Sequence, residues 1–321
     1  MEKLNIGSLE SDKFVLGAGR LGDRTREKDC FEILDAYLDL GYHTLDVARS
    51  YAGGVCEEMM GEYLKKRKNR SKTLLISKGG FPLSRDAMHL TRLSKADLEA
   101  DVNASLRALG TDVIDLYFLH RDDLKQSPAE LIENANLLIR AGKVREIGAS
   151  NWTCGRIKEA NDYALAHGLK PFAASQINYS LAQTTPALTG DLTHVVMNDV
   201  EYRWYRSSRL PMIAYSVQAK GFFSKRLSGL PLKESGRRSY LSLPENYARA
   251  ERLAQLSEQK NIPMPAILIA YVLSKQESFG AIGGFSKKDQ LLEAEPGARL
   301  RLSPAEIGFL ENDHFTNGEC L

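Results

Sequence analysis

Short runs of strand-forming residues alternate with longer segments of helical periodicity along most of this chain. Eight such runs occur, and several are apolar without alternation, as expected for strands that are buried on both faces. They cover residues 14–17, 43–46, 73–78, 113–119, 144–148, 172–176, 212–215 and 280–283. Strands joined by crossover helices run parallel. Eight units of this kind predict an α/β fold, a (β/α)8 TIM barrel, rather than an open sheet.

Two of the helical segments carry recognisable start signals. Ser94 is a candidate N-cap for a helix over 95–109, and Pro128 suits the first turn of a helix over 128–141. Further helices are expected over 28–40 and 57–68. The Gly-, Ser- and Arg-rich stretch 220–240 is predicted to be one long loop after the seventh strand. Because no repeat or linker marks a boundary, residues 1–321 are predicted to form a single barrel domain.

Charge and cysteine usage narrow the classes of partner. The 43 Lys and Arg against 41 Asp and Glu leave a formal charge of +2, which argues against nucleic acid and membrane surfaces. The polar start lacks a secretory signal and no run reaches the roughly 18 apolar residues of a membrane span, so a cytoplasmic location is expected. No obligate protein partner is evident. Four scattered cysteines predict reduced thiols and no metal site: Cys30, Cys56, Cys154 and Cys320.

Polar side chains follow three successive strands. Asp46 ends the second run, with Tyr51 in the loop after it, Lys78 ends the third, and His120 follows the fourth. The carboxyl ends of barrel strands meet at one mouth, where barrel active sites lie. Taken singly, the aspartate reads as a turn residue and the tyrosine as a packing residue. Together they place a carboxylate, a phenol, an ammonium and an imidazole at one point.

Ordered motifs then link this constellation to a known family. Residues 46–51 read D-x-A-x-x-Y. Later stretches are LGTD, IDLY and LHR over 109–121, GKVR and IGASN over 142–151, QINY over 176–179, and AYS with a glycine over 214–221. By these motifs the chain resembles the aldo-keto reductase family over nearly its whole length. The resemblance implies an NAD(P)H-dependent enzyme that reduces an aldehyde or ketone, with the cofactor lying across the C-terminal mouth of the barrel.

The resemblance also assigns roles to the four strand-end residues. Hydride arrival turns a carbonyl oxygen into an alkoxide, which must be protonated or stabilised as it forms. Tyr51 would donate the proton, and the Lys78 ammonium would lower its pKa from the ordinary value of about 10. Asp46 would keep Lys78 charged, and His120 would orient the carbonyl by a hydrogen bond.

No GxGxxG motif of Rossmann type opens a strand–helix unit, so the cofactor residues follow from the resemblance alone. Ser150, Asn151 and Gln176 would hold the nicotinamide carboxamide, Tyr215 would stack under the ring, and 216–221 would run beside the pyrophosphate. The full set of expected cofactor residues is Gly19, Arg20, Ser150, Asn151, Gln176, Tyr215, Ser216, Gln218, Gly221, Gly284, Ser286, Lys288, Gln290 and Glu293.

The end of the eighth strand bears on the choice of cofactor. Lys287 and Lys288 can meet a 2′-phosphate as point charges, which favours NADP(H) over NAD(H). Where relatives close this run with Glu-Asn, the chain has Glu293 and Ala294, which weakens the adenine contact. A solvated lysine pair on a helix start is the competing explanation.

Three alternatives stay open at this level. A cofactor-binding regulatory or scaffold protein with little turnover is the second hypothesis, whereas a hydrolase with paired carboxylates lacks a second strand-end acid. Arg49 and Trp152 either shape the substrate pocket or pack, the arginine against Glu57 and the tryptophan on the fifth helix.

The substrate-selecting loops are expected at 121–127, 222–243 and 312–321. A small carbonyl substrate, polar or sugar-like, and a monomeric state are the expectations.

Overall fold

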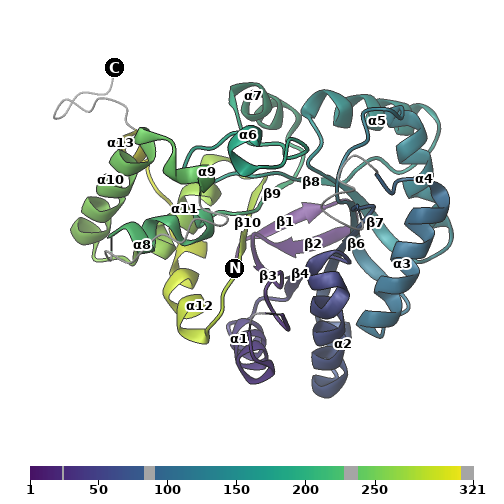
Figure 1. The fold of residues 1–321 in the computed structure, drawn as a ribbon, viewed down its shortest axis with the longest axis horizontal. Coiled ribbons are helices and arrows are strands. Elements are labelled where there is room, and N and C mark those ends of the chain that lie inside the picture. Colours follow the sequence, from purple (N-terminus) through teal and green to yellow (C-terminus); the bar gives the residue numbers. More distant parts are fainter. Residues whose placement is uncertain (24, 83–90, 228–237, 312–321) are drawn as a thin grey trace.

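The computed structural model describes residues 1–23, 25–82, 91–227 and 238–311. Within them, eight parallel strands close into a barrel in the order β10-β3-β4-β5-β6-β7-β8-β9 (Figure 1). The strands are β3 (Phe14–Gly17), β4 (Thr44–Asp46), β5 (Leu74–Gly79), β6 (Ile114–Leu119), β7 (Val144–Ser150), β8 (Ala174–Gln176), β9 (Met212–Ala214) and β10 (Phe279–Gly283). The sequence-based prediction of a TIM barrel is confirmed, because each expected run coincides with one of these strands.

Helices surround the barrel and join successive strands (Figure 1). They are α1 (Glu27–Asp39), α2 (Val55–Arg67), α3 (Lys95–Leu109), α4 (Pro128–Arg140), α5 (Cys154–Ala166), α6 (Pro186–Thr189), α7 (Asp199–Ser208), α8 (Phe222–Leu227), α9 (Arg238–Leu241), α10 (Pro244–Lys260), α11 (Met264–Lys275), α12 (Lys288–Ala294) and α13 (Pro304–Glu311). The Ser94 hydroxyl accepts from the Asp97 amide, and Pro128 occupies the first turn of α4, as the sequence predicted.

Side chains alternate between the inside and the outside of the barrel, because successive residues of a strand face opposite sides. Leu75 and Tyr117 belong to the large cluster that packs under the helices, whereas their neighbours Ile76 and Leu116 belong to a smaller separate cluster. Strands β5 and β6 are buried along their whole length. Burial on both faces explains why these segments are apolar without alternation.

A β-hairpin that the sequence did not predict closes the amino-terminal end of the barrel. Strands β1 (Lys3–Ile6) and β2 (Leu9–Asp12) pair antiparallel and lead directly into β3. Leu4 and Ile6 join the inner cluster, and Ile6 is fully buried. The hairpin side chains therefore fill the interior at the amino-terminal end of the strands. The opposite end, where the carboxyl ends of the strands lie, is called the mouth of the barrel here.

The stretch expected to be one long loop after the seventh strand is in part helical. The short 3₁₀ turn η4 (Ala219–Gly221) and helix α8 follow β9, and α9 precedes α10. Phe222, Phe223 and Tyr240 are fully buried in the core, which anchors the described parts of this stretch. Residues 228–237 lie outside the described residues, as do 312–321 with Cys320.

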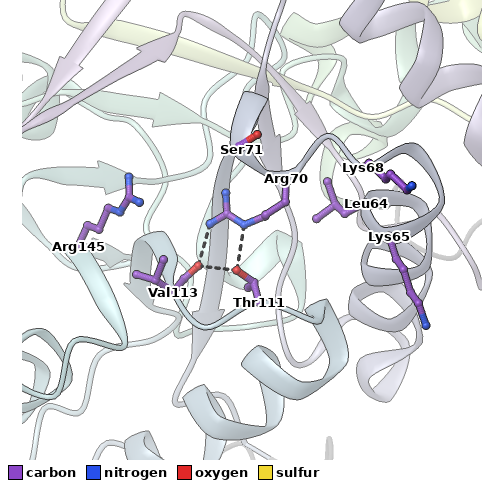
Figure 2. A pocket seen from close by; sticks show the side chains of 8 residues that line it. All are labelled: Leu64, Lys65, Lys68, Arg70, Ser71, Thr111, Val113 and Arg145. Carbon is purple, nitrogen blue, oxygen red and sulfur yellow. Dashed lines mark hydrogen bonds between the residues drawn. The ribbon is translucent and has the colours of Figure 1, made fainter.

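A hollow of about 530 Å³ lies at the opposite end of the barrel from the mouth (Figure 2). Most of its lining residues precede strands β5 and β6, and Arg145 lies at the start of β7. Arg70 donates to Val113 O at 2.7 Å and to Thr111 Oγ1 at 3.1 Å. The Arg70 guanidinium is thus used to hold neighbouring strand starts together. None of the site residues predicted from the sequence lines this hollow.

In the described ranges, no helix is both long and apolar enough to cross a lipid bilayer. Nor does any group of three or more His, Cys, Asp or Glu side chains in these ranges have the arrangement of a metal site. Cys30, Cys56 and Cys154 carry free thiols.

Candidate active site

Asp46 and Lys78 form a buried ion pair at the mouth of the barrel. Lys78 Nζ lies 2.6 Å from Asp46 Oδ1 and donates to Val47 O at 3.0 Å, and both charged side chains are 2% exposed. From β8, on the far side of the barrel, Gln176 Nε2 donates to Asp46 Oδ2 at 2.8 Å. The carboxylate is therefore held from two sides, which a buried ion pair requires.

Tyr51 reaches this pair from a tight turn after β4. The turn, η1 (Tyr51–Gly54), contains three residues with positive φ: Ala52 at 50°, Gly53 at 66° and Gly54 at 109°. The φ of Gly54 is one that residues with a side chain rarely adopt, so this position favours glycine. The turn leaves the Tyr51 hydroxyl 3.2 Å from Lys78 Nζ.

Arg49 stabilises the turn that carries Tyr51. Its Nη1 lies 3.2 Å from Glu57 Oε2, and its Nη2 donates to Gly53 O at 3.2 Å. Glu57 is fully buried and also accepts from Ser77 Oγ at 2.7 Å. Of the two interpretations of Arg49, the ion pair with Glu57 is the one that the structure shows.

Trp152 is also a packing residue. It is fully buried, its ring makes an edge contact with Phe172 at 5.1 Å, and its indole N–H donates to Arg121 O at 3.1 Å. The Arg156 guanidinium of α5 lies 5.4 Å from its ring. A side chain without exposed surface does not line a substrate pocket, so the packing interpretation holds.

Burial and the ion pair set the protonation states of Lys78 and Tyr51. Burial alone would lower the pKa of Lys78, but the electrostatic attraction and hydrogen bonds of Asp46 and Tyr51 together outweigh it and raise that pKa above its ordinary value. Burial raises the pKa of Tyr51 by more than the Lys78 ammonium lowers it. Lys78 thus acts in the expected direction, but burial outweighs it and the pKa of Tyr51 is raised overall. The phenol stays protonated at neutral pH, which is the form that a proton donor needs.

His120 completes the group at the end of β6. Burial, reinforced by the nearby charges of Arg121 and Lys78, holds the pKa of His120 well below its ordinary value, so the ring is neutral. Its ring meets that of Tyr51 edge-on with centroids 5.8 Å apart, and Ser50 Oγ lies 3.3 Å from its Nδ1. A donation from Ser50 to Nδ1 leaves the ring proton on Nε2.

The predicted amide and hydroxyl groups gather beside this group. Ser150 is the last residue of β7, and Asn151 follows it. Asn151 has a left-handed backbone conformation with φ at 59°. Its Nδ2 donates to Ser150 Oγ at 3.1 Å, while its Oδ1 accepts from the Tyr215 hydroxyl at 2.6 Å and from the Val195 amide at 3.2 Å. The structure thus brings together Ser150, Asn151 and Tyr215, and it ties Asn151 to two other strand-end segments.

The backbone after β9 makes a tight turn. Ser216, Ala219, Lys220 and Gly221 have φ of 60°, 47°, 52° and 78°, whereas Gln218 between them has φ −89° and ψ 17°. The amides of Ala219 and Gly221 close the turn by donating to Ser216 O at 2.7 Å and to Gln218 O at 2.9 Å. Exposed Gly19 approaches the same mouth, since a Cβ on it would lie 3.4 Å from the Tyr51 ring. Arg20 beside it is exposed.

The residues after β10 lie on the surface. Gly284, Lys288, Gln290 and Glu293 are exposed, and Ser286 is half-buried. Gln290 Oε1 accepts from the Ser286 amide at 2.9 Å and so stabilises the start of α12. The two lysines at this helix start face solvent with the other side chains of the run.

Residues 13–311 match the family model described as the Aldo/keto reductase family. The chain belongs to the aldo/keto reductase family. The family resemblance read from the sequence is thereby confirmed, and with it the general activity of a nicotinamide-dependent oxidoreductase.

Curated relatives of this aldo/keto reductase include fungal enzymes. An aryl-alcohol dehydrogenase of Pestalotiopsis microspora is 26% identical over 306 residues, which span 92% of this chain and 75% of the relative. Norsolorinic acid reductase B of Aspergillus parasiticus is 26% identical over 309 residues, 93% of this chain and 78% of the relative. A putative aryl-alcohol dehydrogenase of Schizosaccharomyces pombe is 26% identical over 97% of this chain and 94% of its own length.

A solved structure agrees with the fold. A thermostable aldo-keto reductase, crystallised with the inhibitor epalrestat, superposes with a TM-score of 0.75 and 22% sequence identity. The superposition covers 97% of this chain and 99% of that one. At this level of identity the agreement concerns the barrel alone.

Sequence reasoning missed part of the mouth of this aldo/keto reductase. Phe81, shortly after β5, packs on the His120 ring with centroids 5.0 Å apart. Phe81 follows the same strand end as Lys78, so its position after β5 could have marked it as a residue of the mouth. His194 lies 6.2 Å from the Tyr215 ring, and burial lowers the pKa of His194 to about 4. No signal marked His194, because it follows β8 only after a long irregular segment.

Proposed function

We propose that this chain reduces an aldehyde or ketone to an alcohol, with Tyr51 as the proton donor. One observation carries the proposal: the Tyr51 hydroxyl lies 3.2 Å from Lys78 Nζ, which is itself 2.6 Å from Asp46 Oδ1. His120 meets the Tyr51 ring edge-on beside them. This arrangement combines a protonated phenol, a fixed ammonium and a neutral imidazole at one end of the barrel.

Each residue has a role that follows from its contacts. A carbonyl oxygen held between Tyr51 Oη and His120 Nε2 receives two hydrogen bonds, which stabilise the charge that develops on it. A bound nicotinamide supplies the hydride, which no side chain can carry. As the oxygen gains charge, Tyr51 gives it the proton, and the Lys78 ammonium stabilises the phenolate left behind. Asp46 keeps the ammonium in place.

The groups at the mouth fit a nicotinamide dinucleotide. Ser150, Asn151 and Gln176 offer hydroxyl and amide groups of the kind that bind a carboxamide, and the turn at 216–221 would run beside the pyrophosphate. Gln176 Nε2 is used by Asp46, so its carbonyl oxygen is the atom that would face the ligand. Lys287 and Lys288, at the start of α12, support NADP(H) over NAD(H), since their positive charges would attract the extra 2′-phosphate of NADP(H).

The substrate proposed is a neutral, aromatic carbonyl compound. Arg49 pairs with Glu57 and Arg121 with Asp191, so both arginines next to the site already have a carboxylate. Phe81 adds an aromatic face beside His120. The relatives named as aryl-alcohol dehydrogenases point the same way. In the activity test, polar and sugar-like carbonyl compounds are the group with which the aromatic compounds are compared.

The test follows NADPH oxidation by the purified chain with aromatic, aliphatic and sugar-like carbonyl compounds, beside a Tyr51→Phe variant. Removal of a general acid costs roughly 10²- to 10⁴-fold in rate, so Tyr51→Phe should lose most turnover. Its NADPH affinity, measured by quenching of nucleotide fluorescence, should stay near the wild-type value. Tight NADPH binding without Tyr51-dependent turnover on any compound would instead favour a regulatory nucleotide-binding protein.

A further inference from the structure

Arg121 makes an unusual set of contacts for a residue directly after His120. It is 6% exposed, and its Nη1 donates to His120 O at 2.8 Å. Its Nε donates to Thr193 Oγ1 at 2.9 Å, and its Nη2 lies 3.1 Å from Asp191 Oδ2. The guanidinium also lies 4.9 Å from the Phe81 ring. One side chain thus connects the end of β6 with a segment about 70 residues later.

That segment, residues 189–195, is called the Asp191 turn here. Asp191 Oδ1 accepts from the Thr193 amide at 2.9 Å and from its hydroxyl at 2.5 Å. His194 Nδ1 lies 2.8 Å from Thr189 Oγ1. These local bonds make the turn compact, so whatever holds Asp191 and Thr193 fixes the whole turn.

The Asp191 turn also reaches the proposed cofactor residues. The amide of Val195, its last residue, donates to Asn151 Oδ1 at 3.2 Å. The same oxygen accepts from the Tyr215 hydroxyl at 2.6 Å. The position of the turn is therefore coupled to the side chains proposed to bind the nicotinamide.

We propose that Arg121 is a positioning residue that fastens the Asp191 turn to the strand end carrying His120. The inference rests on the proposed function and deepens it, because it names the group that keeps His120, Asn151 and Tyr215 in register with one another. Arg121 itself touches neither substrate nor proton; it acts through the groups that it holds.

The chemistry requires an arginine at this position. A planar guanidinium donates in three fixed directions at once, whereas a lysine ammonium is a point charge on a flexible stem. Lysine can keep the ion pair with Asp191, but its single nitrogen replaces the three separate nitrogens, Nε, Nη1 and Nη2, that reach Thr193, the His120 carbonyl and Asp191. A misplacement of about 1 Å in a catalytic array can cost on the order of 10²-fold in rate. Loss of the bridge should therefore affect the chemical step.

The experiment compares Arg121→Met, Arg121→Lys and Asp191→Asn with Arg156→Met as the matched control. Arg156 of α5 also pairs with a carboxylate, that of Asp122, and donates to the carbonyls of Asp123 and Gln126, so it holds the loop after β6 rather than the Asp191 turn. Amide hydrogen exchange in the Asp191 turn is measured on the cofactor-free proteins. The kinetic constants kcat and KM are measured with the best substrate of the wild type.

Arg121→Met should speed exchange at the amides of Thr193 and Val195 and lower kcat by on the order of 10²-fold. Arg121→Lys should not restore kcat, and adding Asp191→Asn to Arg121→Met should cost little more, because one bridge is lost only once. Arg156→Met should leave the exchange of both amides unchanged.

Two results would overturn the proposal: wild-type exchange at Thr193 and Val195 in Arg121→Met, or a wild-type kcat in that variant. If Arg121→Met does not fold, Asp191→Asn tests the bridge from its other side by the same two measurements. Absence of Tyr51-dependent turnover in the wild type would count against the proposed function alone, because the exchange measurement needs no substrate.

Discussion

Lys78 can remain protonated inside the barrel because Asp46 lies 2.6 Å from its ammonium. Each of the two side chains alone would be an uncompensated charge at a position that is 2% exposed. The same pair holds the Tyr51 hydroxyl at 3.2 Å. Stability of the barrel mouth and the proposed proton transfer therefore depend on one contact.

Replacing Asp46 with Asn should destabilise the fold more than replacing both partners. Asp46→Asn leaves the Lys78 charge buried without a carboxylate, which costs about 3–5 kcal/mol. The double variant Asp46→Asn with Lys78→Met removes that charge and should recover part of the loss. Urea unfolding of the wild type, both single variants and the double variant measures the coupling. Equal stability of Asp46→Asn and the wild type would contradict the expectation.

The sequence allowed some of these residues to be predicted and hid others. Asp46 and Lys78 could be found because each ends a predicted strand, and strand ends converge, whereas Gln176 followed from the family resemblance. The partner of Arg121 could not be found in this way, because Asp191 follows β8 after a segment with no regular pattern. Side-chain pairing across such a distance depends on how the loops fold over the mouth, which periodicity does not encode.

At the level of elements, the hairpin β1–β2 is the part that sequence patterns predicted least. Its strands have four residues each and include charged positions, so their alternation is short and weak. Its inward side chains nevertheless complete the inner cluster. The helices around the barrel were easier to predict because their caps, such as Ser94 and Pro128, stand next to long periodic segments.

Truncation of the hairpin core should be costly. Leu4 is 4% exposed and packs in the inner cluster, so Leu4→Ala should lower the free energy of unfolding by about 2–5 kcal/mol. Leu165 of α5 is 68% exposed. Leu165→Ala is the matched control, and it should change stability by less than about 0.5 kcal/mol. Chemical denaturation compares the two, and similar midpoints for both variants would show that the hairpin does not contribute to the core.

The hairpin should also make stability depend on pH through Asp12 and His43. Burial would raise the pKa of Asp12, but hydrogen bonds from His43 and Lys3 outweigh it and hold that pKa well below its usual range. The bond to Asp12 raises the pKa of His43. The Asp12 contribution is therefore present above its unfolded pKa of about 4 and lost as the pH falls further.

The His43 contribution has the opposite sign. It is present in full below the unfolded pKa of about 6.5 and is lost as the pH rises through the higher folded pKa. Urea midpoints of the wild type and His43→Gln, measured at about pH 5 and about pH 9, should differ more at the lower pH. A difference that stays constant between the two pH values would argue against the ion pair.

At the scale of the whole molecule, the closed barrel followed from eight apolar runs, and the comparison with the family agrees with it. Apolar runs predict strands well when both faces are buried. The described parts of 220–240 were misjudged because glycine, serine and arginine suggested a loop, whereas Phe222 and Tyr240 are anchored in the core. The packing of these aromatic side chains in the core thus decides the local structure against the preference of the surrounding composition.

Cofactor binding should stabilise the whole chain, and more so with NADPH than with NADH. A ligand that binds only the folded state adds about 2.7 kcal/mol at 100 times its Kd. At equal concentrations NADPH should therefore raise Tm further than NADH. Replacing both Lys287 and Lys288 with alanine should reduce this difference, since it removes the charges offered to the extra phosphate. An unchanged difference would place the phosphate elsewhere.

The filled amino-terminal end of the barrel limits the routes by which small molecules can enter and leave it. Leu4 and Ile6 occupy that end, so the described strands leave their carboxyl mouth for both nucleotide and carbonyl compound. Two molecules that share one opening depart in the reverse order of their arrival. Under the proposed function, a nucleotide that lies deeper, against Asn151 and Gln176, would have to enter before the carbonyl compound and leave after the alcohol. Its departure would then set an upper limit on how often the site can be used.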